Sequence, residues 1–185
     1  MKKTVIRFGV ISGAISALMM ITTIPFAEKM GFETAEILGY TTIVLSFLLV
    51  FFGIRSYRDK AGNGTITFGQ GLKVGLLITL ISCVFYVGTW QILSFNFYPD
   101  FMERYSDHVI QQMQASGASA ETVQAKLQEM NWIKERYRNP LFRIAVTLLE
   151  PLPIGLAATL LSAALLRRRR SGSAPIGAAV MAPRE

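Results

Sequence analysis

The residue with the greatest capacity for chemistry is Glu150, which stands inside an otherwise apolar run of this 185-residue chain. A carboxylate within a membrane-spanning helix is costly and often marks an ion or proton pathway. Pro151 and Pro153 follow it directly, and Pro151 cannot bond the carbonyl of Thr147, so we expect a kink or a new helix start there. If the hydrocarbon holds about 20 residues counted back from Leu166, Glu150 lies about 5 Å inside its outer edge. That shallow depth favours a structural role over ion handling.

Three further polar residues are possible partners for Glu150. Gln91 and Asn96 lie in the apolar run that precedes it along the chain, and Arg143 lies seven positions before it. We therefore treat Glu150, Arg143, Gln91 and Asn96 as the candidate functional residues.

Other reactive side chains do not form a recognisable catalytic or metal-binding set. His108 has only Asp107 and Glu103 nearby, too few ligands for a specific metal site, so we expect it on a solvated surface. Cys83 is the single cysteine and is expected to serve in packing. The chain has no HExxH motif, no Walker spacing in its glycine-rich segment 65–71, and no evident Ser-His-Asp set. We predict a protein that is not an enzyme and binds no cofactor or metal.

The elements that carry these residues are four long apolar runs. A hydrocarbon layer of about 30 Å requires about 20 apolar residues in a helix, and the four runs approach or exceed that length. Hydrophobic residues make up 51% of the chain. We predict an all-α integral membrane bundle of four transmembrane helices, forming a single membrane domain at residues 1–170. The predicted spans are residues 8–27, 37–54, 74–98 and 144–166.

The net charge of +7 is explained by orientation rather than by nucleic-acid binding. Lys and Arg collect before the first run, between the second and third, and after the fourth, while the other loops mix both signs. Because cations are retained on the cytoplasmic side, we predict that both termini are cytoplasmic. The cations expected to orient the chain and to contact lipid are Arg55, Arg58, Lys60, Arg167, Arg168, Arg169 and Arg170.

Residues 100–139 form the longest segment between runs, and their pattern is helical. Apolar residues recur every four positions from Phe101 to Met113, and a second stripe runs from Val123 to Tyr137. We predict an extracytoplasmic amphipathic helical hairpin between the third and fourth spans. Its stripes should pack on each other, on the membrane surface or on a partner.

Two residues are placed to start helices around this segment. Ser119 precedes Glu121 at the expected start of the second hairpin helix, and Asn139 precedes Pro140 at the start of the last span. Ser and Asn at these positions accept hydrogen bonds from free backbone N–H groups, so both are predicted N-caps.

Four short motifs occur in an order that resembles a known family. They are GIRSYRDK at 53–60, TFGQGLKVG at 67–75, YPDF at 98–101 and EPLPIGL at 150–156. In these the chain resembles bacterial membrane proteins grouped as domain of unknown function 4199, over roughly residues 4–168. The resemblance implies a four-helix, multi-pass inner-membrane protein of Bacteroidetes-type bacteria with no established activity. The tail at 171–185, rich in Gly, Ala and Pro, falls outside it and is predicted to be disordered in the cytoplasm.

Three classes of function remain open. The first is a non-enzymatic structural or regulatory envelope component that acts through the hairpin on an envelope protein or a second copy of the chain. The second is a subunit of a small oligomeric transporter or channel that uses Glu150. The third, a membrane-embedded enzyme, requires chemistry that the residues do not display.

Overall fold

The structure, a computed structural model, describes residues 1–168, which are almost entirely helical. The helices are α1 (Lys2–Thr23), α2 (Ala27–Met30), α3 (Phe32–Ala61), α4 (Phe68–Asn96), α5 (Phe101–Ala115), α6 (Ala120–Tyr137), α7 (Pro140–Leu148) and α8 (Pro151–Leu166), with a short 3-10 helix η1 (Ile24–Phe26). The predicted all-α fold is confirmed. The predictions made for Arg169, Arg170 and the tail at 171–185 lie outside the described residues.

In the described part of the chain, four helical segments are long and apolar enough to cross a membrane: Lys2–Phe26, Phe32–Ala61, Phe68–Asn96 and Pro140–Leu166. All four begin before the predicted spans and are longer than them, because a helix continues until its backbone is capped rather than until its side chains become polar. At the start of α4, for example, the Thr67 side chain accepts from the Gln70 N–H while the Gln70 side chain accepts from the Thr67 N–H. The prediction of four membrane-spanning helices thus agrees with the fold, although the hydropathy pattern understates their length.

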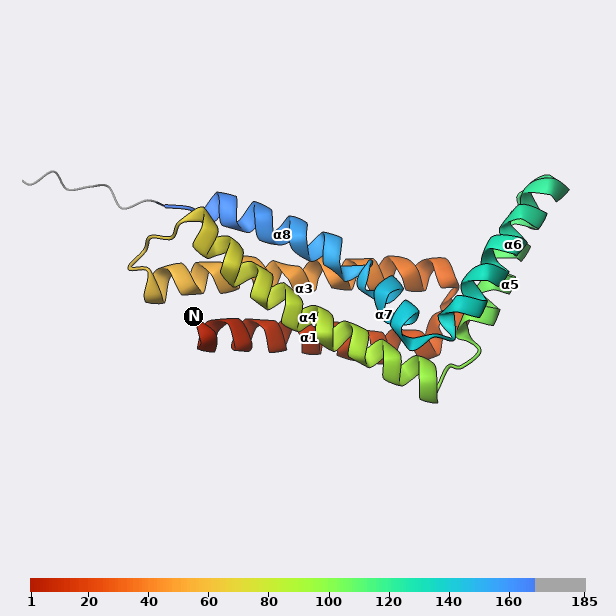
Figure 1. Ribbon diagram of the computed structural model, residues 1–185, viewed down its shortest axis with the longest axis horizontal. Coiled ribbons are helices and arrows are strands. Elements are labelled where there is room, and N and C mark those ends of the chain that lie inside the picture. The colour runs from red at the N-terminus through yellow and green to blue at the C-terminus, as the bar shows by residue number, and fades with distance from the viewer. Residues whose placement is uncertain (169–185) are drawn as a thin grey trace, which may run out of the picture.

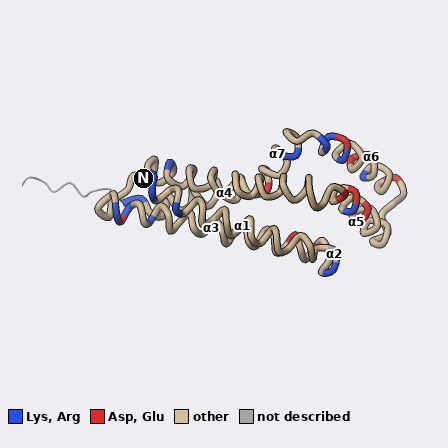
Figure 2. The backbone as a smooth tube through the Cα atoms, turned by 90° about the horizontal axis from the view of Figure 1, so that it is seen from below, with Lys and Arg blue, Asp and Glu red and all other residues tan. Residues whose placement is uncertain are grey.

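The long helices α1, α3, α4 and α8 run side by side as one elongated bundle (Figure 1). Both α1 and α8 pack against α3 and α4. The N-terminus, the α3–α4 loop and the end of α8 lie together at one end, here called the basic end; α5 and α6 lie at the other, here called the hairpin end. Lys and Arg gather at the basic end, the hairpin carries both signs, and little charge lies between (Figure 2).

Small residues let the four long helices approach closely. A Cβ atom added to Gly13 of α1 would lie 2.7 Å from the Phe85 ring of α4, and one added to Gly75 of α4 would lie 2.7 Å from Thr159 of α8. Between helices in lipid, where the hydrophobic effect gives little drive for association, such close backbone approach is a main source of stability.

Buried hydroxyl groups link the same helices. Ser12 and Ser16 of α1 both donate to Ser46 of α3, to its carbonyl and its hydroxyl respectively, each over 2.9 Å. The Thr79 and Thr159 hydroxyls of α4 and α8 lie 3.1 Å apart. These bonds satisfy polar groups that would be costly to leave unpaired in an apolar core, so they also determine how the helices are registered.

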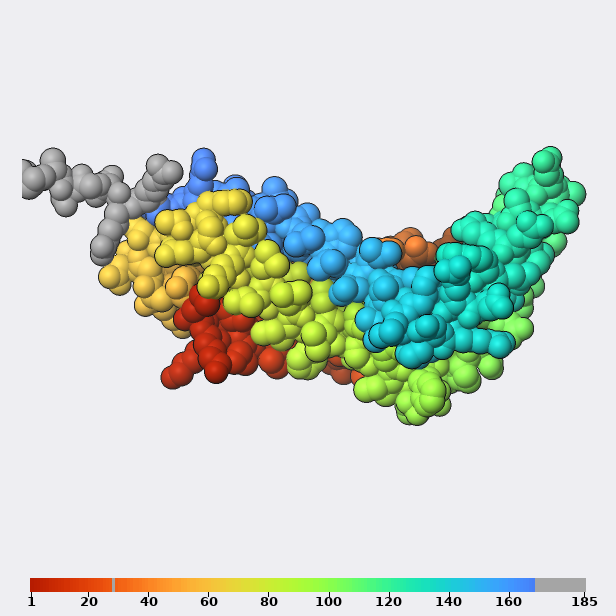
Figure 3. Space-filling view, viewed as in Figure 1, coloured from red at the N-terminus to blue at the C-terminus, as the bar shows by residue number. Residues whose placement is uncertain are grey.

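The hairpin of α5 and α6 projects from the bundle at an angle, with its tip away from the other helices (Figure 3). The Ser119 side chain accepts from the Thr122 N–H at the start of α6, so the predicted N-cap is confirmed. At the base of α5, Phe101 packs on Phe32 with ring centroids 6.1 Å apart, and Gln112 donates to Glu33 at the start of α3. The hairpin is therefore anchored to the bundle along α5.

Candidate functional site

The last span is broken where the sequence predicts it. Helix α7 ends at Leu148 and α8 begins at Pro151, while the Asn139 side chain accepts from the Leu141 N–H and caps α7 as expected. Helix α8 packs against α3 and α4, whereas the main neighbours of α7 are α4 and α6. The break therefore redirects the last span at the hairpin end.

A cavity of about 440 Å³ lies at the hairpin end, beneath the base of the hairpin. Side chains from α1, α3, α4, α5, α6 and α7 line it, and its volume is in the range typical of small-molecule sites. The wall is rich in aromatic rings and also contains four methionines. The aromatic residues are Phe32, Tyr40, Tyr86, Trp90, Phe101, Tyr105 and Tyr137; the methionines are Met19, Met20, Met102 and Met130.

Glu150 reaches this cavity from the break between α7 and α8. It occupies the N-cap position of α8, but its side chain makes no capping hydrogen bond there. Its carboxylate instead accepts from the Tyr86 hydroxyl of α4 over 2.5 Å, while the residue stays exposed. The carboxylate is thus positioned by one neutral donor and remains open to the cavity.

Glu36 of α3 is a second carboxylate in the cavity wall. Glu36 and Glu150 therefore contribute two carboxylates to the same wall. Among the lining residues, all within the described part of the chain, there is no Lys, Arg or His. The cavity therefore concentrates negative charge within an aromatic wall.

The other three candidate residues lie outside the cavity wall. Arg143 Nε donates to Gln91 Oε1 over 2.6 Å, and the Arg143 guanidinium lies 5.9 Å from the Tyr137 ring centroid. Asn96 Nδ2 donates to the Ile92 carbonyl of its own helix. The structure therefore pairs Arg143 with Gln91, while Glu150 has Tyr86 as its hydrogen-bond partner in place of the three residues expected from the sequence.

The hairpin residues that line the cavity are uncharged and mostly apolar, with Tyr105 and Tyr137 as the polar members. The Trp90 Nε1–H donates to the Tyr137 hydroxyl over 2.6 Å, which ties the end of α6 to α4. Burial raises the pKa of Tyr137, and burial together with the Glu36 carboxylate raises the pKa of Tyr105. Both phenols therefore stay protonated at neutral pH and can act as hydrogen-bond donors.

Sequence reasoning missed Glu36, Tyr86 and Trp90 as members of this site. Glu36 precedes the second apolar run, a position that indicates a loop residue, but α3 begins at Phe32 and carries Glu36 into the wall. Tyr86 and Trp90 are four residues apart and so share one face of α4, which is the signal that could have indicated an aromatic wall.

The expectation that His108 lies on a solvated surface is wrong. Its ring lies tilted against the Phe32 ring, with centroids 4.9 Å apart, and its Nε2 atom is buried without a hydrogen-bond partner. Packing of α5 on the start of α3 covers it, a contact between segments far apart in the chain that its acidic neighbours do not indicate. Within residues 1–168, leaving aside the side chain of Glu28, which the structure does not describe, no three His, Cys, Asp or Glu side chains gather closely enough to hold a metal ion.

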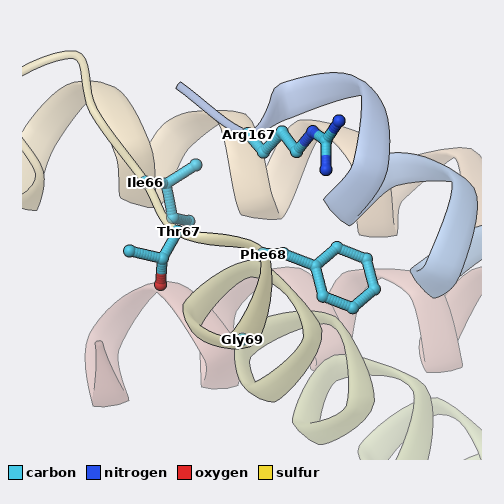
Figure 4. A pocket seen from close by; sticks show the side chains of 5 residues that line it. All are labelled: Ile66, Thr67, Phe68, Gly69 and Arg167. Carbon is cyan, nitrogen blue, oxygen red and sulfur yellow. The ribbon is translucent and has the colours of Figure 1, made fainter. Parts of the chain in front are cut away.

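A second cavity of about 660 Å³ opens at the basic end (Figure 4). It lies where the α3–α4 loop meets the end of α8, which are joined by two backbone hydrogen bonds of 3.0 Å between Ile66 and Arg168. The chain continues from Arg168 into residues that the structure does not describe, so the hairpin-end cavity is the better-defined candidate. The residues that line the second cavity are Ile66, Thr67, Phe68, Gly69 and Arg167.

A family model described as "Protein of unknown function (DUF4199)" matches residues 7–168, which include every residue of the hairpin-end cavity. The chain belongs to this family. The family membership predicted from the four short motifs is thereby confirmed. Comparison with curated proteins and with solved structures found no match. A function for this family member must therefore be argued from its own residues.

Proposed function

We propose that this protein is a non-enzymatic structural or regulatory component of the membrane that acts through its α5–α6 hairpin. The observation that carries the proposal is that α5 anchors the hairpin to the bundle while part of α6 stays exposed. Phe101 and Tyr137 at the base line the cavity, whereas Leu127, farther along α6, is 42% exposed. A hairpin built in this way can present a surface to a partner while it remains coupled to the bundle.

The outer surface of α6 offers contacts suited to a protein partner. Leu127 and Trp132 are exposed large apolar side chains of α6, and we propose that Leu127 contacts either an envelope protein or a second copy of this chain. The change Leu127→Glu places a charge in that contact. Gln128→Glu adds the same charge at a neighbouring exposed position, about 100° around the helix, and serves as the matched control.

The test is crosslinking in native membranes followed by purification, with two differently tagged copies to identify self-association. The proposal predicts a crosslinked partner with the wild type and with Gln128→Glu, and its loss with Leu127→Glu. Recovery of single, uncrosslinked copies from wild-type membranes would contradict it.

We further propose a bacterial inner-membrane location with both termini in the cytoplasm, so that the hairpin lies outside. The supporting observation is the set of cations at the basic end, which includes Arg55, Arg58 and Lys60. In a Cys83→Ala background, cysteines at Asn63 and Ser116 mark the two ends. An impermeant maleimide added to intact cells should label Ser116→Cys alone, and labelling of Asn63→Cys would reverse the assignment.

A second candidate is a subunit of an oligomeric transporter or channel, because Glu150 is open to a cavity rather than enclosed by protein. Closer to the basic end, however, the bundle is tightly packed: a Cβ atom on Gly155 would meet Thr79 and would lie 2.8 Å from the Phe47 ring. Transport would require these helices to separate. If they do, Glu150→Gln should abolish ion flux in proteoliposomes without loss of folding; unchanged flux, or none with the wild type, would count against transport.

A further inference from the structure

The negative charge of the hairpin-end cavity has no counter-charge in its wall. Glu36 and Glu150 line the cavity together, and the only hydrogen-bond donor recorded at Glu150 is the neutral hydroxyl of Tyr86. Glu36 and Glu150 are both exposed residues, and an opposite charge nearby favours the ionised form of a carboxylate. A cationic ligand would supply the positive charge that is absent from the lining residues.

The remaining wall determines which kind of cation fits. Aromatic faces attract organic cations through their quadrupoles, and methionine side chains adapt to apolar substituents. A divalent metal ion such as Ca²⁺, by contrast, requires six to eight or so oxygen ligands in a compact cage, whereas this wall contains two carboxylates among rings and thioethers. The surroundings therefore favour an organic cation over a metal ion.

We propose that this cavity binds an organic ammonium, whose charge pairs with Glu36 and Glu150 and whose apolar substituents contact Tyr86, Trp90 and neighbouring rings. The volume of about 440 Å³ admits a cation with substituents larger than methyl groups. Tyr40 and Met19 in the wall are 44% and 38% exposed, so the cavity has an opening through which a ligand can enter. The ammonium can belong to a lipid headgroup or to a free amine.

This inference goes beyond the proposed function, since the hairpin could contact a partner whether or not the cavity is occupied. The proposed hairpin contact and the proposed ligand site can each be contradicted without affecting the other. Loss of the crosslinked partner with Leu127→Glu tests the hairpin surface, and ligand titration of purified protein tests the cavity.

The chain provides its own reporter, because it has two tryptophans and only one of them, Trp90, lines the cavity. The variant Trp132→Phe leaves Trp90 as the single indole, and Trp90→Phe gives the matched protein with the reporter outside the cavity. Both are reconstituted into phosphatidylglycerol nanodiscs and titrated with tetraethylammonium, with choline, and with 3,3-dimethylbutanol, the uncharged carbon analogue of choline.

The proposal predicts saturable changes in Trp90 emission with both cations, and none with Trp90→Phe. Since the charge contributes to binding, choline should bind about tenfold or more tightly than dimethylbutanol. Glu36→Gln and Glu150→Gln should each weaken tetraethylammonium binding about tenfold, which corresponds to the loss of one charge contact. Glu121→Gln, at the hairpin tip, removes the same charge away from the cavity and should leave binding unchanged.

Replacing part of the lipid by phosphatidylethanolamine distinguishes the sources of the ammonium. Competition by this lipid against tetraethylammonium identifies the headgroup amine, and its absence identifies a free amine; both support the site. Equal binding of choline and dimethylbutanol, or unchanged binding in both Gln variants, would overturn the proposal. So would the absence of any saturable response in protein that elutes as a folded species.

Discussion

The two halves of the bundle contain the same helices but differ in packing: one half is a closed core and the other surrounds a cavity. Toward the basic end, Val50, Ile54, Val74 and Ile78 are completely buried, and the helices close on one another through glycine and hydroxyl side chains. Toward the hairpin end, the same α3 and α4 contribute aromatic rings and a carboxylate to an open cavity. The difference shows that closure depends on side-chain size and on the course of the last span, rather than on the helices themselves.

The break between α7 and α8 marks the boundary between the halves. Gly155, one turn into α8, allows that helix to contact α3 and α4, and Thr159 continues the contact one turn later. On the other side of the break, the Glu150 carboxylate accepts a hydrogen bond from Tyr86, and α7 packs against α6 of the hairpin. One interruption in one helix is thus enough to divide a packed core from a cavity.

The largest expected effect comes from adding a methyl group to the closed half. Gly155→Ala places a Cβ atom against Thr79 and Phe47, and overpacking of this kind costs about 1–3 kcal/mol. We expect a clear fall in melting temperature in detergent. Gly88→Ala, also within a helix but with open space around the new atom, should be neutral or slightly stabilising. Equal melting temperatures for the two variants would show that the closed half is less tightly packed than described.

The second-largest effect is expected from removing the break between α7 and α8. The double change Pro151→Ala and Pro153→Ala restores the missing backbone donors and permits one continuous helix. We expect the last span to straighten toward α3 and the cavity to shrink, with loss of the Trp90 response to tetraethylammonium. Spin labels at Ile37 and Leu141, both exposed, should report a changed distance between α3 and α7. Retention of both the distance and the response would mean that the prolines do not maintain the cavity.

A smaller effect concerns the hydrogen bond that positions Glu150. Tyr86→Phe removes the donor and should lower the unfolding free energy by about 1 kcal/mol, because the exposed carboxylate regains water in exchange. Tyr40→Phe removes a hydroxyl from the same wall with no hydrogen bond recorded to it, and should change stability little. If both variants unfold alike, Tyr86 is a wall residue only and does not position Glu150.

The smallest effect is a gain in stability at the hairpin base. His108→Phe keeps the ring contact with Phe32 and removes the unpartnered Nε2, which should stabilise the docked hairpin by about 1 kcal/mol. This gain in stability should be seen as slower hydrogen exchange in α5 and at the start of α3. His108→Gln retains buried polar atoms and should not slow exchange. Faster exchange in His108→Phe would indicate that the imidazole has a partner at this position.

The sequence predicts the helices of this molecule and their ends better than it predicts the residues of the hairpin-end cavity. Charge-free runs, the Ser119 and Asn139 caps and the Pro151 break are local signals, and each corresponds to a feature of the structure. The pairing of Glu150 with Tyr86 joins residues 64 positions apart, and it depends on how α4 and the last span are rotated toward each other. Hydropathy does not encode that rotation, because a helix in lipid is apolar on all sides.

The same reasoning explains the error at His108 and the omission of Glu36. The charged neighbours of His108 in the chain indicate a solvated position, whereas packing of α5 against the start of α3 determines its surroundings. Glu36 precedes an apolar run, but the early start of α3 carries it into the cavity wall. Long-range contacts of this kind leave little trace in a single sequence.

The contrast between the halves can be measured directly by cysteine modification with reagents of opposite charge. In a Cys83→Ala background, Thr23→Cys places a thiol in the cavity wall, and Thr159→Cys places one in the closed half. The account predicts that Thr23→Cys reacts with a trimethylammonium-ethyl thiosulfonate faster than with its sulfonato-ethyl counterpart, since Glu36 and Glu150 attract the cation, and that Thr159→Cys reacts with neither until the protein unfolds. Comparable reaction at both positions, or faster reaction of Thr23→Cys with the anionic reagent, would contradict it.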